Sequence, residues 1–284
     1  MKTGSVFFLL VLFCCSGCGI LKMKNPRRAG EFPEKTEALR LHGELTPQRR
    51  CFDVKHYDLN IFIDPFKKQI GGTVTVSAEM VETADSVQLD LHPSFIVKQI
   101  RVDGLPVTYS RRYNAMLIPV AAKRGTKFRI AIDYEGIPVE AQKPPWLGGA
   151  VWNVDSDLNH WLGVACETEG ASIWWPSKDH TSDEADSTSI HLTVPDGYTA
   201  VSNGRLQSSE TKGNNITWNW QVSYPINTYN ITYYVGRFAH VRDKYESKIT
   251  GQALDLDYYV LSENKTKAQK HFAQVKDILD LYER

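Results

Sequence analysis

Residues 144–204 read PPWLGGAVWNVDSDLNHWLGVACETEGASIWWPSKDHTSDEADSTSIHLTVPDGYTAVSNG, and this stretch decides the fold class. It places aromatic residues, the acidic Glu167 and a Pro-x-x-Asp turn at Pro176–Asp179 between strand-like runs. Runs of β-branched and aromatic residues bounded by Gly, Pro, Asn and Asp are typical of short strands joined by turns. No helical period interrupts them, so the stretch favours an all-β domain.

Strand-like runs with a period of two continue on both sides of this stretch. Residues 57–63 place Tyr57 and every second residue after it on one apolar face, and residues 73–78 alternate likewise after a break at Gly71-Gly72. We expect these two runs to form an antiparallel pair. Turn residues recur at regular intervals, which is typical of a β-sandwich. Further strands are predicted at residues 86–91, 96–102, 115–120, 127–134, 187–194, 198–202, 215–222 and 229–234.

The carboxyl-terminal residues 265–284 change period. Apolar residues recur there at steps of three and four, which predicts a helix with one apolar face. We expect this helix to follow a strand at residues 254–259. The predicted apolar face consists of Phe272, Val275, Ile278, Leu279 and Tyr282.

Length and charge exclude several classes of protein. The chain has 284 residues, of which 42% are hydrophobic, so it can bury a full core. Its 33 basic and 33 acidic residues give a formal net charge of zero, so no long-range field attracts nucleic acid or an anionic membrane surface. Nucleic acid is therefore excluded as an expected partner.

The amino terminus reads as an export signal over residues 1–18. Lys2 supplies a positive start, residues 6–15 form an apolar run too short to span a bilayer, and small residues precede Cys18. This order resembles a bacterial lipobox, although Cys15 stands where Leu is usual. It predicts lipidation of Cys18 and a membrane anchor made of acyl chains, with a plain cleaved signal as the alternative. We expect an exported protein that faces the periplasm or the cell exterior.

Residues 19–50 separate this signal from the first predicted strand. They are rich in Lys, Arg, Glu and Pro and show no sustained periodicity. We therefore expect a tether that holds the folded part away from its attachment point.

Beyond the signal, only Cys51 and Cys166 remain. They lack the Cys-x-x-Cys spacing of metal or redox sites. Cys166 lies in an apolar run, where a thiol acts as a small hydrophobic group. Two unpaired thiols are therefore favoured over a single disulfide.

Several of these pieces together resemble the amino-terminal β-domain of the M1 zinc aminopeptidases, which include aminopeptidase N and leukotriene A4 hydrolase. In that family a Glu or Gln precedes an aromatic-Pro-x-x-Asp segment, and a strand then leads to Val-x-Ser-Asn-Gly. Here those places are held by Glu167, Trp175-Pro176, Asp179 and Val201-Ser202-Asn203-Gly204. The likeness extends to the strand end at residues 132–136 and to residues 225–229.

The resemblance implies a mainly β fold, with a saddle-shaped antiparallel β-sandwich over residues 51–245. In the family this domain leads into a thermolysin-like catalytic domain. Residues 246–284 resemble the first strand and helix of that domain. The chain ends at Arg284 within the predicted helix, so we expect a truncated catalytic domain.

By this resemblance, Glu167 is the functional residue of the β-domain. It lies nine positions before Pro176, where the family places a residue that binds the amino terminus of the peptide substrate. A carboxylate can form a charge-assisted hydrogen bond with the free α-ammonium group. From the sequence alone, a solvated strand-end Glu is an equal alternative. Ala165 and Ser172 stand where Gln and Arg are common in the family, which predicts an altered pocket.

The zinc chemistry of the family requires a helix with His-Glu-x-x-His, which places two imidazoles one turn apart. We expect no zinc site and no cofactor in this chain, which would be inactive as it stands. The resemblance implies zinc in the complete family enzyme, which removes amino-terminal residues from peptides. No two histidines of the chain are four positions apart: they are His42, His56, His92, His160, His180, His191, His240 and His271.

Seven tryptophans support a second hypothesis, an exported noncatalytic β-sandwich module that binds carbohydrate or peptide. Trp218 and Trp220 are expected to share a strand face. The neighbours Trp174 and Trp175 should point to opposite faces, so that at least one of them is free to line a cleft. Core packing is favoured over sugar stacking for these rings.

Two further interpretations concern acidic residues. A Ca²⁺ loop at Asp179, Asp183, Glu184 and Asp186 matches no EF-hand spacing, so a solvated turn is favoured. A hydrolase with paired carboxylates stays open, because such pairs meet only in the fold, but no motif supports it.

Overall fold

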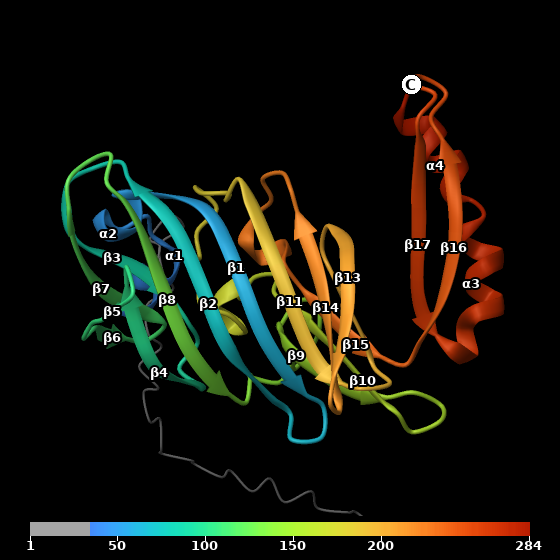
Figure 1. Ribbon diagram of the computed structural model, residues 1–284, viewed down its shortest axis with the longest axis horizontal. Coiled ribbons are helices and arrows are strands. Elements are labelled where there is room, and N and C mark those ends of the chain that lie inside the picture. Colours follow the sequence, from blue (N-terminus) through green and yellow to red (C-terminus); the bar gives the residue numbers. More distant parts are fainter. Residues whose placement is uncertain (1–34) are drawn as a thin grey trace, which may run out of the picture. The chain divides into compact units, whose positions relative to one another are not determined.

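The structure is a computed structural model that describes residues 35–284. The predicted export signal, Cys18 and the first part of the predicted tether lie outside the described residues, so lipidation stays a prediction. Residues 36–284 form one compact unit, and strands make up most of it (Figure 1). The prediction of a mainly β fold is therefore confirmed.

Eight strands form the largest sheet. They are β1 Phe52–Asp64, β2 Gln69–Met80, β4 Phe95–Val102, β5 Leu105–Pro106, β8 Lys127–Gly136, β11 Ser187–Pro195, β13 Arg205–Lys212 and β14 Asn215–Val222. Their order across the sheet is β13-β14-β11-β1-β2-β8-β4-β5. Neighbouring strands are antiparallel except β1 and β11, which run parallel.

Three smaller sheets complete the described strands. A four-stranded sheet has the order β12 Thr199–Ser202, β15 Tyr233–Gly236, β10 His160–Ala165 and β9 Gly149–Val154. A three-stranded sheet has the order β3 Ala84–Asp90, β7 Ala115–Ala122 and β6 Ser110–Arg112. The hairpin of β16 Phe238–Glu246 and β17 Ala253–Leu261 follows near the carboxyl end.

The antiparallel pair β1 and β2 shows how alternating residues build this fold. Its predicted pairing is confirmed, with Tyr57 opposite Val76. However, β2 runs through Gly71-Gly72 and is not broken there. The β1 backbone approaches so closely that a Cβ on Gly72 would lie 2.0 Å from the carbonyl oxygen of Asn60. The inward-facing residues of β1 are each at most 1% exposed: Tyr57, Leu59, Ile61 and Ile63.

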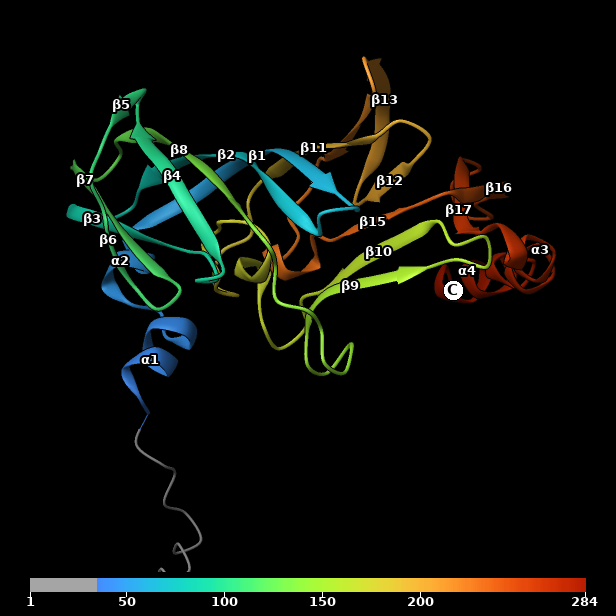
Figure 2. The same cartoon turned by 90° about the horizontal axis from the view of Figure 1, so that it is seen from below.

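The core lies between the eight-stranded sheet and the four- and three-stranded sheets (Figure 2). Trp218 and Trp220 of β14 share a face, as predicted. Their indole N–H groups donate to the carbonyl oxygens of Tyr198 at 3.1 Å and Ala200 at 3.0 Å. These two indole groups thus find partners in the opposite layer, as in a β-sandwich.

Residues 36–50, predicted to belong to a tether, form two short helices. Helix α1 spans Glu37–Gly43 and α2 spans Pro47–Arg50. The hydroxyl groups of Thr36 and Thr46 cap their amino ends. Arg49 of α2 is fully buried. Because this residue places a charge in the interior, residues 36–50 pack as part of the folded unit.

The helix predicted at residues 265–284 is divided into α3 Lys265–Phe272 and α4 Val275–Tyr282. Phe272 stacks on Tyr258 of β17, with ring centroids 4.3 Å apart. Tyr282, on the same predicted face, is 82% exposed, so the protein covers only part of that face.

Three-residue 3-10 helices lie at Ala171–Ile173, Thr228–Asn230 and Ser262–Asn264. Within residues 35–284, no helix has the length and apolar character needed to cross a membrane.

Candidate functional site

Glu167 lies in a tight turn that follows β10. The backbone N–H groups of Glu169 and Gly170 both donate to the carbonyl oxygen of Cys166, at 3.1 and 2.8 Å, and close the turn. Thr168 has a φ of +67°, a left-handed conformation that β-branched residues rarely adopt. The turn presents the Glu167 side chain at the surface, where it is exposed.

Two neighbouring segments hold this turn. The Thr168 hydroxyl donates to the carbonyl oxygen of Trp146 at 3.0 Å. From α1, the His42 ring places Nε2 3.2 Å from the carbonyl oxygen of Glu169. The two residues that follow Glu167 are therefore held by contacts from other parts of the chain.

Asp179 fixes the chain just after the turn. Its carboxylate oxygens accept hydrogen bonds from the backbone N–H groups of Ala171 at 3.1 Å and Ser172 at 3.0 Å. Gly170 has a φ of +85°, and a Cβ there would lie 2.2 Å from Asp179 Oδ2. Only glycine allows this close approach. Asp179 therefore supports the turn, with both oxygens already bound by the protein.

A buried ion pair lies next to Asp179. Arg49 Nη2 is 2.8 Å from Asp90 Oδ2, and neither side chain is exposed. Asp90 Oδ1 accepts a hydrogen bond from Gln88 Nε2 at 2.8 Å, and the backbone N–H of Asp179 lies 3.4 Å from Asp90 Oδ2. Asp90 also pairs through its backbone with Ser177. Because isolated buried charges are costly, this pairing makes α2 part of the support beneath the site.

A second buried pair holds the following loop. Lys178 Nζ lies 2.5 Å from Asp183 Oδ2 and donates to the carbonyl oxygen of Phe52 at 2.6 Å. The backbone N–H of Val54 also donates to Asp183 at 3.1 Å. Asp179 and Asp183 therefore bind protein groups, so the prediction of a solvated turn is wrong for these two residues. Asp179 accepts hydrogen bonds from the turn that follows Glu167, and Asp183 accepts them from β1 and from Lys178.

A cavity of about 450 Å³ opens beside Glu167. Its wall includes Leu39 and His42 of α1, His180 and residues 227–229. No hydrogen bond or ion pair joins the Glu167 carboxylate to another residue of the described chain. This carboxylate is therefore available to a ligand that enters the cavity.

Burial controls the ionisation of two groups at this cavity. It raises the pKa of the Cys166 thiol to about 12, so the thiol is protonated at neutral pH. Burial, followed by the charges of Arg49 and Lys178, lowers the pKa of His180 below its usual value and keeps the ring neutral. Cys51 and Cys166 are both free, as predicted, and both are buried.

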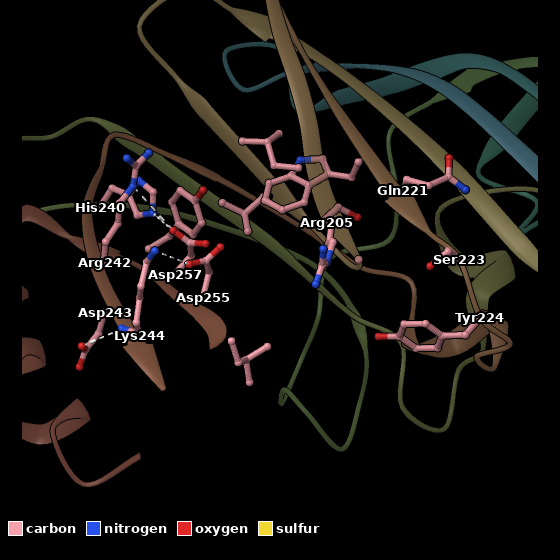
Figure 3. Close-up of a pocket in the computed structure, with 17 residues that line it drawn as sticks. Arg205, Gln221, Ser223, Tyr224, His240, Arg242, Asp243, Lys244, Asp255 and Asp257 are labelled. Carbon is pink, nitrogen blue, oxygen red and sulfur yellow. Dashed lines mark hydrogen bonds and ion pairs between the residues drawn. The ribbon is translucent and has the colours of Figure 1, made fainter. Parts of the chain in front are cut away.

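A larger hollow of about 1220 Å³ is lined by residues of β13, β14, β16 and β17 (Figure 3). Its three carboxylates each have a basic partner, and that of Asp243 is Lys276, with Nζ 2.6 Å from Oδ1. His240 Nε2 lies 2.6 Å from Asp257 Oδ1, and Lys244 Nζ lies 3.6 Å from Asp255 Oδ1. Because these carboxylates already have partners, the hollow is a weaker candidate for ligand binding than the Glu167 cavity.

No group of three or more His, Cys, Asp or Glu side chains within residues 35–284 lies close enough to hold a metal ion. The residues around Glu167 therefore do not fit a zinc ion. No zinc-dependent step is assigned to this part of the chain.

The tryptophans lie mainly in the core. Trp174 and Trp175 are both fully buried, and Trp175 meets Tyr57 edge-on with ring centroids 4.9 Å apart. The prediction that one of the two lines a cleft is wrong, because a 3-10 turn replaces the expected strand at this point. All seven tryptophans belong to the described chain, and Trp146 alone is largely exposed, at 61%. The described surface therefore offers no row of exposed indole rings for stacking on sugars.

Comparison with known families identifies the domain that carries the Glu167 turn. The family model described as the Peptidase M1 N-terminal domain matches residues 53–230. The chain belongs to the M1 peptidase family. The matched residues run from β1 to the 3-10 helix after β14, so they include Glu167, Asp90 and Asp179, whereas His42 and Arg49 precede them. The resemblance inferred from the sequence is confirmed.

Solved M1 structures share this fold. An M1 zinc metallopeptidase from Deinococcus radiodurans, bound to a Tyr-Ser-Ala substrate, has a TM-score of 0.65 and 22% identity, covering 75% of this chain and 48% of its own. Yeast leukotriene A4 hydrolase has a TM-score of 0.62 and 19% identity, covering 88% of this chain and 37% of its own. This chain thus spans about half or less of these M1 enzymes. No curated protein matches it.

The structure brings Glu167 together with residues that sequence reasoning missed. Leu39 and His42 were assigned to a tether, although they share the cavity with Glu167. Local signals for α1 and α2 were present in Thr36 and in Thr46-Pro47, which are typical helix starts. Those signals predict helices but cannot place them beside Glu167.

Proposed function

We propose that this chain is the substrate-recognition domain of an exported M1 metallo-aminopeptidase and that Glu167 binds the free α-ammonium group of the peptide. The observation that supports it most strongly is the exposed Glu167 carboxylate, which has no partner among residues 35–284 and stands on a fixed turn beside a cavity. Membership in the M1 family supports the reaction class. The complete enzyme would remove amino-terminal residues from peptides.

The chemistry of the peptide amino terminus suits this carboxylate. An α-ammonium group presents three N–H donors and a positive charge below its pKa of about 8. A carboxylate can accept one or two of these donors in charge-assisted hydrogen bonds. Because only the first residue of a peptide carries this group, a fixed Glu167 would align the chain from its end and so direct cleavage to the first peptide bond.

The charge of the cavity also favours a cation. No Lys or Arg of the described chain lines it, whereas Asp179 and Glu167 both do. Burial keeps His180 neutral at neutral pH by lowering its pKa. A ligand with a positive group therefore meets two carboxylates and no Lys or Arg in the described wall of the cavity.

Kinetics of the complete enzyme test the proposal. Glu167→Ala should lower kcat/KM for peptides with a free amino terminus by about ten- to a hundredfold, because a charge-assisted contact is worth about 1.5–3 kcal/mol. For peptides with an acetylated amino terminus, the same substitution should change kcat/KM little, since they lack the charged group.

Glu210→Ala is the matched control, because Glu210 is an exposed carboxylate on β13 outside the cavity. Glu210→Ala should leave kcat/KM unchanged for peptides with a free amino terminus and for acetylated peptides. Full activity of Glu167→Ala on free-amine peptides would show that Glu167 is only a solvated turn residue. A complete protein without peptidase activity would instead favour the second hypothesis, a noncatalytic binding module.

A further inference from the structure

Helix α1 contributes an apolar wall to the Glu167 cavity. Leu39 and His42 lie three positions apart, so they share one face of the helix. Both residues line the cavity. Leu39 is 59% exposed although it is large and apolar, so the fold of the domain makes little use of it. An apolar side chain at the edge of a cavity is suited to contact a ligand.

Hydrogen bonds hold α1 in this position. His42 Nε2 is 3.2 Å from the carbonyl oxygen of Glu169, within the turn that carries Glu167. On the opposite side, Gln88 Nε2 donates to the carbonyl oxygen of Leu41 at 3.0 Å. Gln88 is completely buried, so it ties α1 to the interior. The wall formed by Leu39 is therefore fixed relative to Glu167.

We propose that Leu39 is a specificity-determining residue that contacts the first side chain of a peptide whose α-ammonium group is bound by Glu167. The inference rests on the proposed function of Glu167. The ammonium group and the first side chain are attached to the same carbon atom, so both must lie within one cavity. Leu39 then favours peptides that begin with an apolar residue over those that begin with glycine, because apolar contact removes surface from water.

His42 acts in this scheme as a positioning residue. It does not need to touch the peptide, because its contact with Glu169 links the apolar wall to the turn of Glu167. Loss of that contact frees α1 on this side. The distance between wall and carboxylate then varies, and selection by the first side chain weakens.

Ligand-observed NMR titration of the full chain with L-leucinamide and glycinamide tests the inference. Both ligands carry the α-ammonium group, and they differ only in the side chain. Leucinamide should bind more tightly than glycinamide. Leu39→Ser should weaken leucinamide binding about three- to tenfold and leave glycinamide unchanged, because only the side-chain contact is lost.

Leu39→Met and Leu45→Ser are the controls. Leu39→Met keeps an apolar side chain of similar size and should retain the preference for leucinamide. Leu45 is 39% exposed and lies outside the cavity, so Leu45→Ser should retain it as well. His42→Ala should reduce the preference, and His42→Gln should restore it, because the Gln amide can still donate to the Glu169 carbonyl oxygen.

The titration separates failure of this inference from failure of the proposed function. If Glu167→Gln weakens both ligands while Leu39→Ser leaves their affinity ratio unchanged, the role of Leu39 is overturned and that of Glu167 stands. If Glu167→Gln weakens neither ligand, recognition by Glu167 is overturned. Equal affinity of the unaltered chain for leucinamide and glycinamide also overturns the role of Leu39 in specificity.

Discussion

The carboxylates that support the cavity and the exposed carboxylate at its rim are the same chemical group in opposite situations. Asp90, Asp179 and Asp183 each accept hydrogen bonds from protein groups, and two of them also pair with buried cations. Glu167 has no such partner in the described chain. The first set supports the site, whereas the second is free to bind a ligand.

Desolvation explains this difference. A carboxylate removed from water must regain its lost hydrogen bonds and charge compensation within the protein. Once it has done so, it has little capacity left for a ligand. A rim carboxylate keeps its water until a ligand replaces it, so Glu167 contributes little to folding and can contribute much to binding.

Removal of the cation from the buried pair should give the largest effect. Arg49→Met leaves Asp90 buried without its charge partner, so the free energy of unfolding should fall by about 3–5 kcal/mol. Urea unfolding followed by tryptophan fluorescence measures this change, since the core contains several buried tryptophans.

The neighbouring Arg50 provides the control. It pairs with Glu82 at 3.1 Å, but both side chains are about half exposed, at 56% and 49%. Arg50→Met should therefore cost less than about 1 kcal/mol. Similar losses for Arg49→Met and Arg50→Met would show that burial does not distinguish the two pairs.

Asp179, which supports the turn, and Glu167, which lies at the rim of the cavity, allow a direct comparison of their effects on stability. Asp179→Ala removes the acceptors of two backbone N–H groups on the buried residues Ala171 and Ser172, so it should cost about 1–3 kcal/mol of stability. Glu167→Ala should stay within about 0.5 kcal/mol of the unaltered chain. Thermal unfolding of both variants checks the pair, and a larger loss for Glu167→Ala would reverse the assignment.

The smallest effect concerns two histidines next to these regions. Burial lowers the pKa values of His92 and His180 below the usual 6.5, with a further contribution from Arg111 for His92 and from Arg49 and Lys178 for His180. As the pH falls through 6.5, these histidines therefore become protonated in the unfolded chain before they do so in the folded chain. Protonation stabilises the unfolded state, so the free energy of unfolding falls.

A double variant with His92→Gln and His180→Gln isolates this contribution from other titrating groups. Between pH 7.5 and 5.5 the unaltered chain should lose stability relative to the double variant. Urea unfolding of both proteins at the two pH values measures the difference. If the stability difference between the two proteins is the same at both pH values, these rings are not held neutral by the fold.

Much of the fold could be predicted from local sequence patterns. The alternation at residues 57–63 and 73–78 identified β1 and β2, because one face of each strand is buried. Strand β13 was missed, since all of its residues are exposed and no alternation marks it. The parallel pairing of β1 with β11 also has no local signal, because the two strands lie far apart in the chain.

The sequence by itself determined the β class, the M1 family and the candidate Glu167, because strand period, turn residues and the spacing from Glu167 to Pro176 are local properties of the chain. It could not decide which carboxylate would be free. Asp179 and Glu167 are both acidic residues of one segment, and only the folded turn shows that Asp179 binds the backbone of Ala171 and Ser172 whereas Glu167 has no partner in the described chain.

The tertiary structure decided the surroundings of Glu167. It placed α1 against the turn through His42 and buried Arg49 beside Asp90, both across long separations in sequence. Such contacts depend on how the layers pack and not on neighbouring residues. For that reason the available carboxylate and its apolar wall emerge only when the chain is folded.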